Sequence, residues 1–273
     1  MMKSPPFTKR SVSISFSRAS ATYDSFSMVQ RIANQRLIEL LPKGFYKNIL
    51  EIGTGTGMLA LELLQRVHCR RYIGMDISFA MLEKAQEKLS NIGAEKLLIC
   101  CDAEELPIRH ASLNAELVVS SNTLQWFTDL KNFISILSEK AMSENGLFLI
   151  SLFGNNSLKE LQKILDEYAG RHHPIPTSAF PHETQVLHAI KPYMNIISLK
   201  KMKIEKSYAH FWDLLLSLKR TGVVPRDVHS PPVFRSKRAI ENADKIYRDF
   251  FGDIIASFEI FLILAQKDLS YSS

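Results

Sequence analysis

Cysteine is scarce in this chain of 273 residues, which contains only Cys69, Cys100 and Cys101. One separated and two adjacent cysteines build no disulfide framework, and their spacing does not match a zinc site. Long apolar runs are also missing, and the longest, Ile260–Ala265, is far too short to cross a membrane. The N-terminus lacks the apolar stretch of a signal peptide. We therefore expect a cytoplasmic protein with reduced thiols and no membrane segment.

Patterns of metal ligands and of catalytic nucleophiles are absent as well. His172 and His173 are followed by Pro174, and neither has a partner at the helical i, i+4 spacing of a metal motif. The proline indicates a loop. No Ser/His/Asp or Cys/His pattern stands out elsewhere. The sequence therefore predicts no metal site and no nucleophilic enzyme.

A glycine-rich turn is the most informative feature that is present. The sequence ILEIGTGTG places Gly53, Gly55 and Gly57 directly after an apolar strand that contains Glu51. The spacing differs from the dinucleotide pattern G-x-G-x-x-G, and an acidic residue would repel a pyrophosphate. The same acid would attract a ligand ammonium group. A ligand that combines a nucleoside with an amino acid is S-adenosylmethionine (SAM), which we expect here. A turn that serves packing alone is the alternative.

Three further strands support a nucleoside site, because two of them also end in acidic residues. Arg71–Asp76 ends in a carboxylate, which in a doubly wound sheet accepts hydrogen bonds from the ribose hydroxyls. Leu97–Cys101 leads to Asp102 and Ala103, where a carboxylate can reach the adenine amine. A fourth strand, Leu117–Ser120, ends in a serine that we add to the cofactor site. We predict a doubly wound α/β fold with a seven-stranded, mostly parallel sheet.

The second half of the chain contains an insertion. Strands are predicted at 146–153, 195–203 and 254–265, and about 50 residues separate the last two, far more than an ordinary hairpin loop. Helices are expected at 210–219 and 236–251. The predicted parts are an N-terminal segment over the cofactor site (1–45), a core (46–203), a helical insertion (204–252) and the final strand with the tail (253–273).

Positive charge concentrates around this insertion. Between Lys200 and Ile240, ten basic residues accompany three acidic ones, a net charge of +7, whereas the whole chain carries +6. A solvated charged face is the alternative to an acidic partner, which would be a nucleic acid or an acidic carrier protein. Aromatic residues are not interleaved with the basic ones and no RNA-binding motif is present, so we expect no nucleic acid. Lys219, Arg220 and Arg226 are the predicted docking residues.

Several of these segments resemble one family. Residues 16–30, FSRASATYDSFSMVQ, are similar to the opening of the malonyl-acyl-carrier-protein O-methyltransferases of biotin synthesis. The similarity continues through the glycine turn and the Leu-Lys-x-x-Gly element of the insertion. A departure is Thr54, where relatives often have cysteine. The other matching segments are Met75–Ser78 with Met81 and Leu82, Asp102–Pro107, Ser121–Trp126, Leu152–Gly154 and Leu215–Gly222.

The resemblance implies a class I SAM-dependent methyltransferase that esterifies the free carboxylate of a malonyl group on an acyl carrier protein. Such a reaction needs no general base, because a carboxylate with a pKa near ~4 is already ionised at neutral pH. Gln125 and Trp126 follow the fourth strand, where the methyl group is expected; Gln125 would hold the carboxylate by a neutral hydrogen bond, and Trp126 would form an apolar wall. Tyr23 lies where this fold class often places a helix over the SAM pocket, and we expect it to close the site. Simple packing is the alternative for Trp126 and for Tyr23.

Two other functions remain open. One is methylation of a small free acid, because trans-aconitate methyltransferases have a similar Leu-Gln-Trp. The other is a role like that of the mitochondrial complex I assembly factors, which act on a protein partner. An RNA methyltransferase would fit the sequence pI of about 9.1, but this sequence contains no RNA-binding motif.

Overall fold

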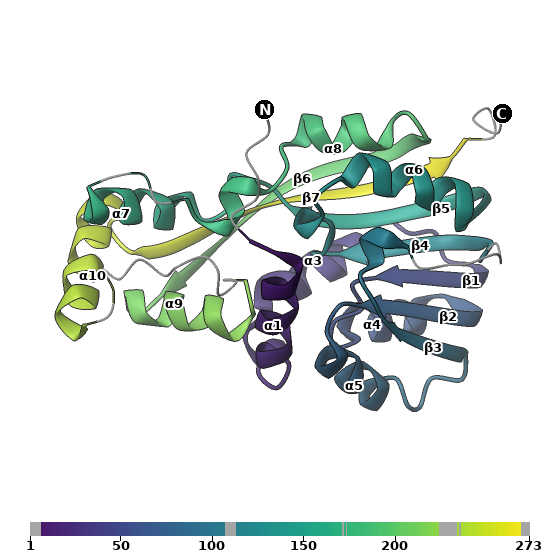
Figure 1. Ribbon diagram of the computed structural model, residues 1–273, viewed down its shortest axis with the longest axis horizontal. Coiled ribbons are helices and arrows are strands. Elements are labelled where there is room, and N and C mark those ends of the chain that lie inside the picture. Colours follow the sequence, from purple (N-terminus) through teal and green to yellow (C-terminus); the bar gives the residue numbers. More distant parts are fainter. Residues whose placement is uncertain are drawn as a thin grey trace.

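In the computed structural model, seven strands form one sheet in the order β3-β2-β1-β4-β5-β7-β6 (Figure 1). The structure describes residues 7–106, 113–170, 172, 174–223, 234 and 236–268, and the count of strands refers to these. β7 is antiparallel to both neighbours, and the other pairs are parallel. The strands are β1 (Phe45–Ile52), β2 (His68–Asp76), β3 (Glu95–Cys100), β4 (Ala115–Ser121), β5 (Met142–Phe153), β6 (Met194–Tyr208) and β7 (Ile254–Lys267). The predicted doubly wound, mostly parallel sheet is confirmed.

Helices cover both faces of this sheet. Successive residues of a strand point to opposite faces, so Val118 and Val119 of β4 lie in two different apolar clusters. The cluster around Val119 includes buried residues of α3 (Met28–Ile38) and α4 (Met58–Arg66). The cluster around Val118 includes residues of α6 (Leu130–Lys140) and α8 (Glu183–Ile190). Burial on both faces explains why the central strands are continuous apolar runs.

Serine side chains cap the starts of two helices. The Ser78 hydroxyl accepts a hydrogen bond from the Met81 amide at the start of α5 (Phe79–Lys88). The Ser236 hydroxyl does the same for the Ala239 amide at the start of α10 (Lys237–Phe251). In each case the side chain satisfies one of the free amides of the first helical turn.

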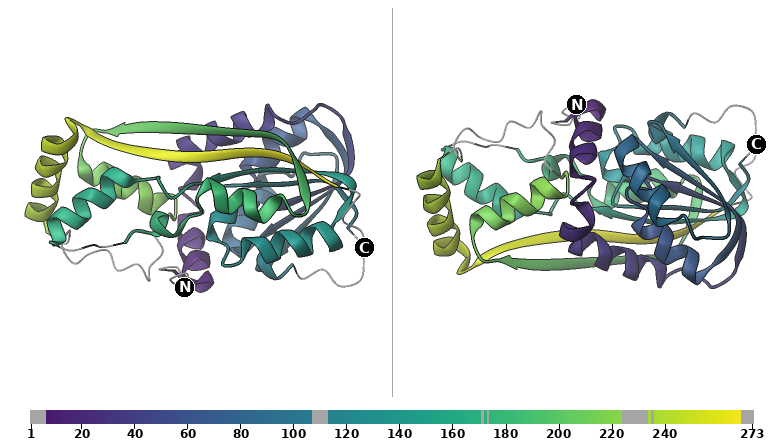
Figure 2. Two further views of the ribbon diagram at one scale, coloured as in Figure 1. Left: turned by 90° about the horizontal axis from the view of Figure 1, so that it is seen from above. Right: turned by 90° about the horizontal axis from the view of Figure 1, so that it is seen from below.

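The last two strands extend beyond the rest of the sheet. β5 ends at Phe153, opposite Ile260, whereas β6 and β7 remain paired until Tyr208 meets Ile254. Figure 2 shows α7 (Lys159–Ala169), α9 (Phe211–Arg220) and α10 gathered around this extension. The predicted end of the sixth strand at residue 203 was wrong. The strand continues because Ile204 and Tyr208 face inward, while the charged residues between them obscure the apolar pattern.

The N-terminal helices lie at the carboxyl ends of the parallel strands. In Figure 1, α1 (Lys9–Ala19) stands between these strand ends and α9. α1 contacts α5, and the short α2 (Tyr23–Phe26) contacts α9. In open α/β sheets, ligands bind outside the carboxyl ends of the strands. The chain therefore places α1 and α2 over the region where a ligand is expected.

Candidate active site

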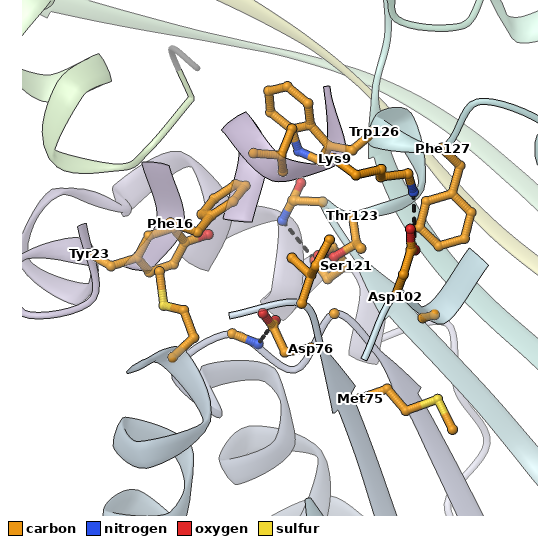
Figure 3. A pocket seen from close by; sticks show the side chains of 17 residues that line it. Lys9, Phe16, Tyr23, Met75, Asp76, Asp102, Ser121, Thr123, Trp126 and Phe127 are labelled. Carbon is orange, nitrogen blue, oxygen red and sulfur yellow. Dashed lines mark hydrogen bonds and ion pairs between the residues drawn. The ribbon is translucent and has the colours of Figure 1, made fainter. Parts of the chain in front are cut away.

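A cavity lies between α1 and the carboxyl ends of the strands (Figure 3). Its wall combines the glycine turn, the ends of β2 and β4, and aromatic side chains from several segments. The lining residues are Lys9, Val12, Phe16, Tyr23, Gly53, Gly55, Met75, Asp76, Ile77, Met81, Asp102, Ala103, Ser121, Asn122, Thr123, Trp126 and Phe127.

The surroundings of the three glycines in the turn differ in the space that they leave for a side chain. All three have left-handed φ angles, between 56° and 77°. A Cβ on Gly53 would lie 1.9 Å from the Thr123 hydroxyl oxygen, and one on Gly57 would lie 3.1 Å from the Ala85 Cα. A Cβ on Gly55 would meet nothing within 4 Å. Gly53 and Gly57 are thus required by packing, while Gly55 leaves its space free for a ligand. Gly57 does not line the cavity.

Asp76 fixes the turn and faces the cavity. One carboxylate oxygen accepts a hydrogen bond from the Gly55 amide at 2.8 Å, and the other accepts one from the Ser78 amide at 2.8 Å. Burial raises the pKa of Asp76 to about 6, although the backbone hydrogen bonds oppose this rise. Each carboxylate oxygen has a second lone pair, so the group can also accept hydrogen bonds from a ligand. The placement fits the predicted ribose acceptor.

Glu51 lies beneath the turn rather than in the cavity. Its side chain is 1% exposed and accepts a hydrogen bond from the Tyr72 hydroxyl at 2.5 Å. Burial, together with the nearby charge of Asp76, raises the pKa of Glu51 to about 8 against the opposing effect of the Tyr72 hydrogen bond. We expected this carboxylate to attract a ligand ammonium group. The structure instead leaves Asp76 and Asp102 as the acids that line the cavity.

Lys9 of α1 forms ion pairs with acidic residues just after the end of β3. Its ammonium group lies 3.3 Å from an Asp102 oxygen and 2.5 Å from a Glu104 oxygen, and 4.4 Å from the centre of the Phe127 ring. Asp102 and Ala103 line the cavity as predicted, but Asp102 is already paired. Sequence patterns did not reveal Lys9, because its partners lie more than 90 residues away.

Trp126 is the centre of an aromatic wall. Three rings meet it edge to face, with centroids 4.9 Å away for Phe7, 5.9 Å for Phe16 and 5.0 Å for Phe180. The side chain is 4% exposed, and its indole N–H has no hydrogen-bond partner among the described residues. A buried donor without a partner destabilises the protein by about 1–3 kcal/mol. Such a group at a cavity wall is therefore a candidate ligand contact.

Tyr23 lines the same cavity from α2. Burial, and to a smaller extent the charges of Asp76 and Asp24, raise its pKa well above the usual range, so the hydroxyl stays protonated. The ring also packs at 6.3 Å from Phe16. The hydroxyl can thus donate a hydrogen bond but cannot act as a base.

Two predicted site residues point elsewhere. Gln125 is buried and donates its amide hydrogen to the Asn122 carbonyl at 2.8 Å, and Ser120 donates to the Ile52 carbonyl at 2.8 Å. Neither lines the cavity. Asn122 does line it, with a left-handed φ of 54°, and was missed. The signal was the polar run Ser120–Thr123 directly after an apolar strand, at the sheet edge where ligands bind.

The predicted docking residues lie beside the N-terminal segment. Lys219 and Arg220 are exposed at the C-terminal end of α9, and the Arg220 carbonyl accepts a hydrogen bond from the Thr22 hydroxyl at 3.1 Å. Arg226 lies outside the described residues. Other basic residues of the charged segment have acidic partners: Lys201 with Glu183 and Glu259, Lys203 with Glu205, and Lys237 with Glu241.

The described part of the chain contains no group of three or more His, Cys, Asp or Glu side chains that could hold a metal ion. None of its helices combines the length and apolar character needed to cross a membrane.

Comparison with known proteins relates the chain to methyltransferases. Residues 49–140 match the model of a methyltransferase domain family. A malonyl-acyl-carrier-protein O-methyltransferase of Geobacter sulfurreducens is 34% identical over 62% of this chain and 61% of the relative. A protein of the same name from Ilyobacter polytropus is 27% identical over 90% of this chain and 88% of the relative. The matches to the first three relatives span 52–61% of their lengths.

The fold has solved counterparts. Geranyl diphosphate C-methyltransferase of Streptomyces coelicolor, solved with S-adenosyl-L-homocysteine, superposes with a TM-score of 0.53 over 86% of this chain and 75% of that protein, at 12% identity. Identity this low shows the fold alone. The order of the strands agrees with that fold class.

Proposed function

We propose that this chain, a class I methyltransferase by its fold and its methyltransferase domain, binds SAM and methylates the free carboxylate of a malonyl group carried by an acyl carrier protein. This would be an early step of biotin synthesis. The observation that carries the proposal is the cavity lined by the open side of Gly55, by Asp76 and by Trp126, whose indole N–H has no hydrogen-bond partner among the described residues. Similarity to enzymes of that name along 90% of the chain supports the substrate.

The residues of the cavity fit SAM. Gly55 lets a ligand approach the backbone, and Asp76 can accept hydrogen bonds from the ribose hydroxyls. Ala103 and Asp102 would lie near the adenine. When bound, SAM supplies an electrophilic methyl group on a sulfonium. The chain's own task is to orient the acceptor and to exclude water.

The carboxylate that receives the methyl group needs a hydrogen-bond donor that leaves it nucleophilic. A carboxylate is ionised at neutral pH, so no base is required. The Trp126 N–H is neutral, buried and unpartnered, and it would hold a carboxylate oxygen without neutralising its charge. The Gln125 side-chain amide already donates to the Asn122 carbonyl. We therefore propose that Trp126, rather than Gln125, donates the hydrogen bond to the carboxylate that is methylated. Tyr23 would cover the site, with its protonated hydroxyl available to SAM or to the acceptor.

The function is tested by transfer of a labelled methyl group from SAM to malonyl-acyl carrier protein, malonyl-coenzyme A and free malonate. We expect ester formation with the highest kcat/KM on the carrier-linked substrate. Trp126→Phe keeps an aromatic wall but removes the N–H, and should lower kcat/KM roughly 10- to 100-fold without weakening SAM binding. Preference for free malonate would indicate a small-acid methyltransferase. No transfer to any of the three would overturn the proposal.

We further propose that the insertion between β6 and β7 docks the carrier protein through Lys219 and Arg220. Both are exposed next to the N-terminal segment that covers the cavity. Complementary charge between proteins acts mainly on the rate of encounter and is screened by salt over about 8 Å. A carrier docked here would reach the cavity past α2.

Reversal of this charge should impair the carrier-linked substrate selectively. We expect Lys219→Glu with Arg220→Glu to raise KM for malonyl-acyl carrier protein roughly tenfold at low salt, with less effect on malonyl-coenzyme A and none on SAM affinity. Lys131→Glu with Lys140→Glu on α6 is the matched control, since Lys140 also lies in the last turn of its helix. If both double variants raised KM for malonyl-acyl carrier protein equally, or if neither raised it, the docking role would be wrong.

The same proposal places the reaction in the cytoplasm.

A further inference from the structure

Polar side chains attach the N-terminal helices to the ends of the strands. On α1, the Ser13 hydroxyl donates to the Ile77 carbonyl at 3.0 Å, and the Ser17 and Ser78 hydroxyls lie 2.8 Å apart. Lys9 adds its ion pairs with the segment after β3. These contacts hold α1 against the segments that follow β2 and β3. The glycine turn after β1 is contacted from α2.

Asp24 of α2 makes this contact through both of its carboxylate oxygens. Oδ1 accepts a hydrogen bond from the Thr56 hydroxyl at 2.6 Å, and Oδ2 accepts one from the Lys88 ammonium group on α5 at 2.5 Å. Lys88 also donates to Thr56 Oγ1 at 3.2 Å, so each of the three side chains contacts the other two. A hydroxyl bond to a carboxylate at this distance is charge-assisted, and such bonds are roughly twice as strong as neutral ones.

The Thr56 side chain gives this contact a fixed position. It is buried and lies between Gly55 and Gly57. The Gly55 amide donates to Asp76, and the Gly57 amide donates to the Thr54 carbonyl at 3.0 Å, so the backbone of the turn is held on both sides of Thr56. A half-exposed ion pair alone would contribute little to this geometry. The hydrogen bond to Thr56 therefore sets where α2 lies relative to the backbone that SAM would contact.

Tyr23 directly precedes Asp24 and lines the cavity, whereas Asp24 does not. Burial is the main cause of the raised pKa of Tyr23, and the charges of Asp76 and Asp24 add to it, so the Tyr23 hydroxyl lies near both carboxylates. The Asp24 side chain itself is 46% exposed and is turned to Thr56 and Lys88. An effect of Asp24 on a ligand would therefore pass through Tyr23.

We propose that Asp24 is a positioning residue, which ties α2 to the glycine turn and thereby holds Tyr23 over bound SAM. This rests on the proposed function, in which Tyr23 covers the site. With the contact intact, α2 and the turn move together, and Tyr23 stays in place while the methyl group is transferred. Without the contact, α2 opens more often, so SAM leaves sooner and methyl transfer slows.

The rate of SAM dissociation tests this role without turnover. A chase of labelled SAM from its complex by excess unlabelled SAM measures this rate. We expect Asp24→Ala to raise it roughly tenfold. Lys88→Met should raise it less, because the hydrogen bond between Asp24 and Thr56 would remain. Glu87→Ala is the matched control, since it removes the partner of Lys84 in an exposed ion pair on the same helix, away from the cavity. It should release SAM like the wild type.

A double-mutant cycle with Tyr23→Leu shows whether Asp24 acts through Tyr23. We expect Asp24→Ala alone to lower kcat on malonyl-acyl carrier protein roughly tenfold. In the Tyr23→Leu background, the same change should alter kcat and SAM dissociation by less than about twofold, because the residue that it positions is gone. A loss of packing or stability alone would instead give additive effects.

The positioning role would be overturned by additive effects in this cycle, by wild-type SAM dissociation in Asp24→Ala, or by an equal change in Glu87→Ala. Failure of the wild type to methylate any malonyl compound would instead overturn the proposed function. The dissociation rates of SAM would still test the role of Asp24 in that case, so the two failures are distinguishable.

Discussion

Gly55→Val should abolish SAM binding, with a loss of affinity of at least about 100-fold, or roughly 2.8 kcal/mol. The expected cause is steric. A Cβ at this position points into the cavity, with no protein atom within 4 Å, so the branched side chain would occupy the ligand's space. Valine also disfavours the left-handed φ of 56°. Calorimetric titration with SAM measures the loss directly.

The control for this substitution is Gly170→Val. Gly170 has a similar left-handed φ of 63° and equally open surroundings, but it lies at the C-terminal end of α7, away from the cavity. Both variants should lose stability to a similar extent, because both force valine into the same backbone region. Only Gly55→Val should lose SAM. Equal SAM affinity in both variants would show that the turn does not carry the cofactor.

Asp76→Asn should weaken SAM binding roughly 10- to 150-fold. The substitution preserves the shape of the side chain but removes the charge and one acceptor oxygen. A hydrogen bond to a charged group contributes about 1.5–3 kcal/mol, which sets this range. Asp129→Asn is the control, because Asp129 caps α6 outside the cavity. If both variants bound SAM as tightly as the wild type, Asp76 would have no part in the cofactor site.

The same residue gives SAM binding a pH dependence. Burial raises the pKa of Asp76 to about 6 in the free protein, so the carboxyl is largely protonated below that pH. The ionised form accepts the ribose hydrogen bonds, and binding then requires the release of a proton. Affinity should therefore be constant above pH 7 and fall towards tenfold per pH unit below pH 6. Asp76→Asn should lack this contribution. A flat profile in the wild type would contradict the assignment.

Much of the fold followed from local patterns. Apolar strands, the glycine turn and the helix at 236–251 depend on neighbouring residues, so they are visible in sequence. The end of β6 was not visible, because its pairing partner lies about 50 residues further along the chain. An edge strand with charged residues on its exposed face has a weak apolar alternation. Only the register with β7 shows that the strand reaches Tyr208.

The site divides in the same way. The sequence by itself determined the turn at Gly55 and the carboxylate of Asp76, because a strand that ends in a glycine or an acid places that residue at the ligand edge of a parallel sheet. It could not determine which side chains point into the cavity. Glu51 and Gln125 have the expected position but face inward to Tyr72 and Asn122, since strand register and local hydrogen bonds set their direction. Trp126 gained its aromatic neighbours from segments far apart in the chain. Tertiary packing alone decided these contacts, because burial and the availability of partners are properties of the folded molecule.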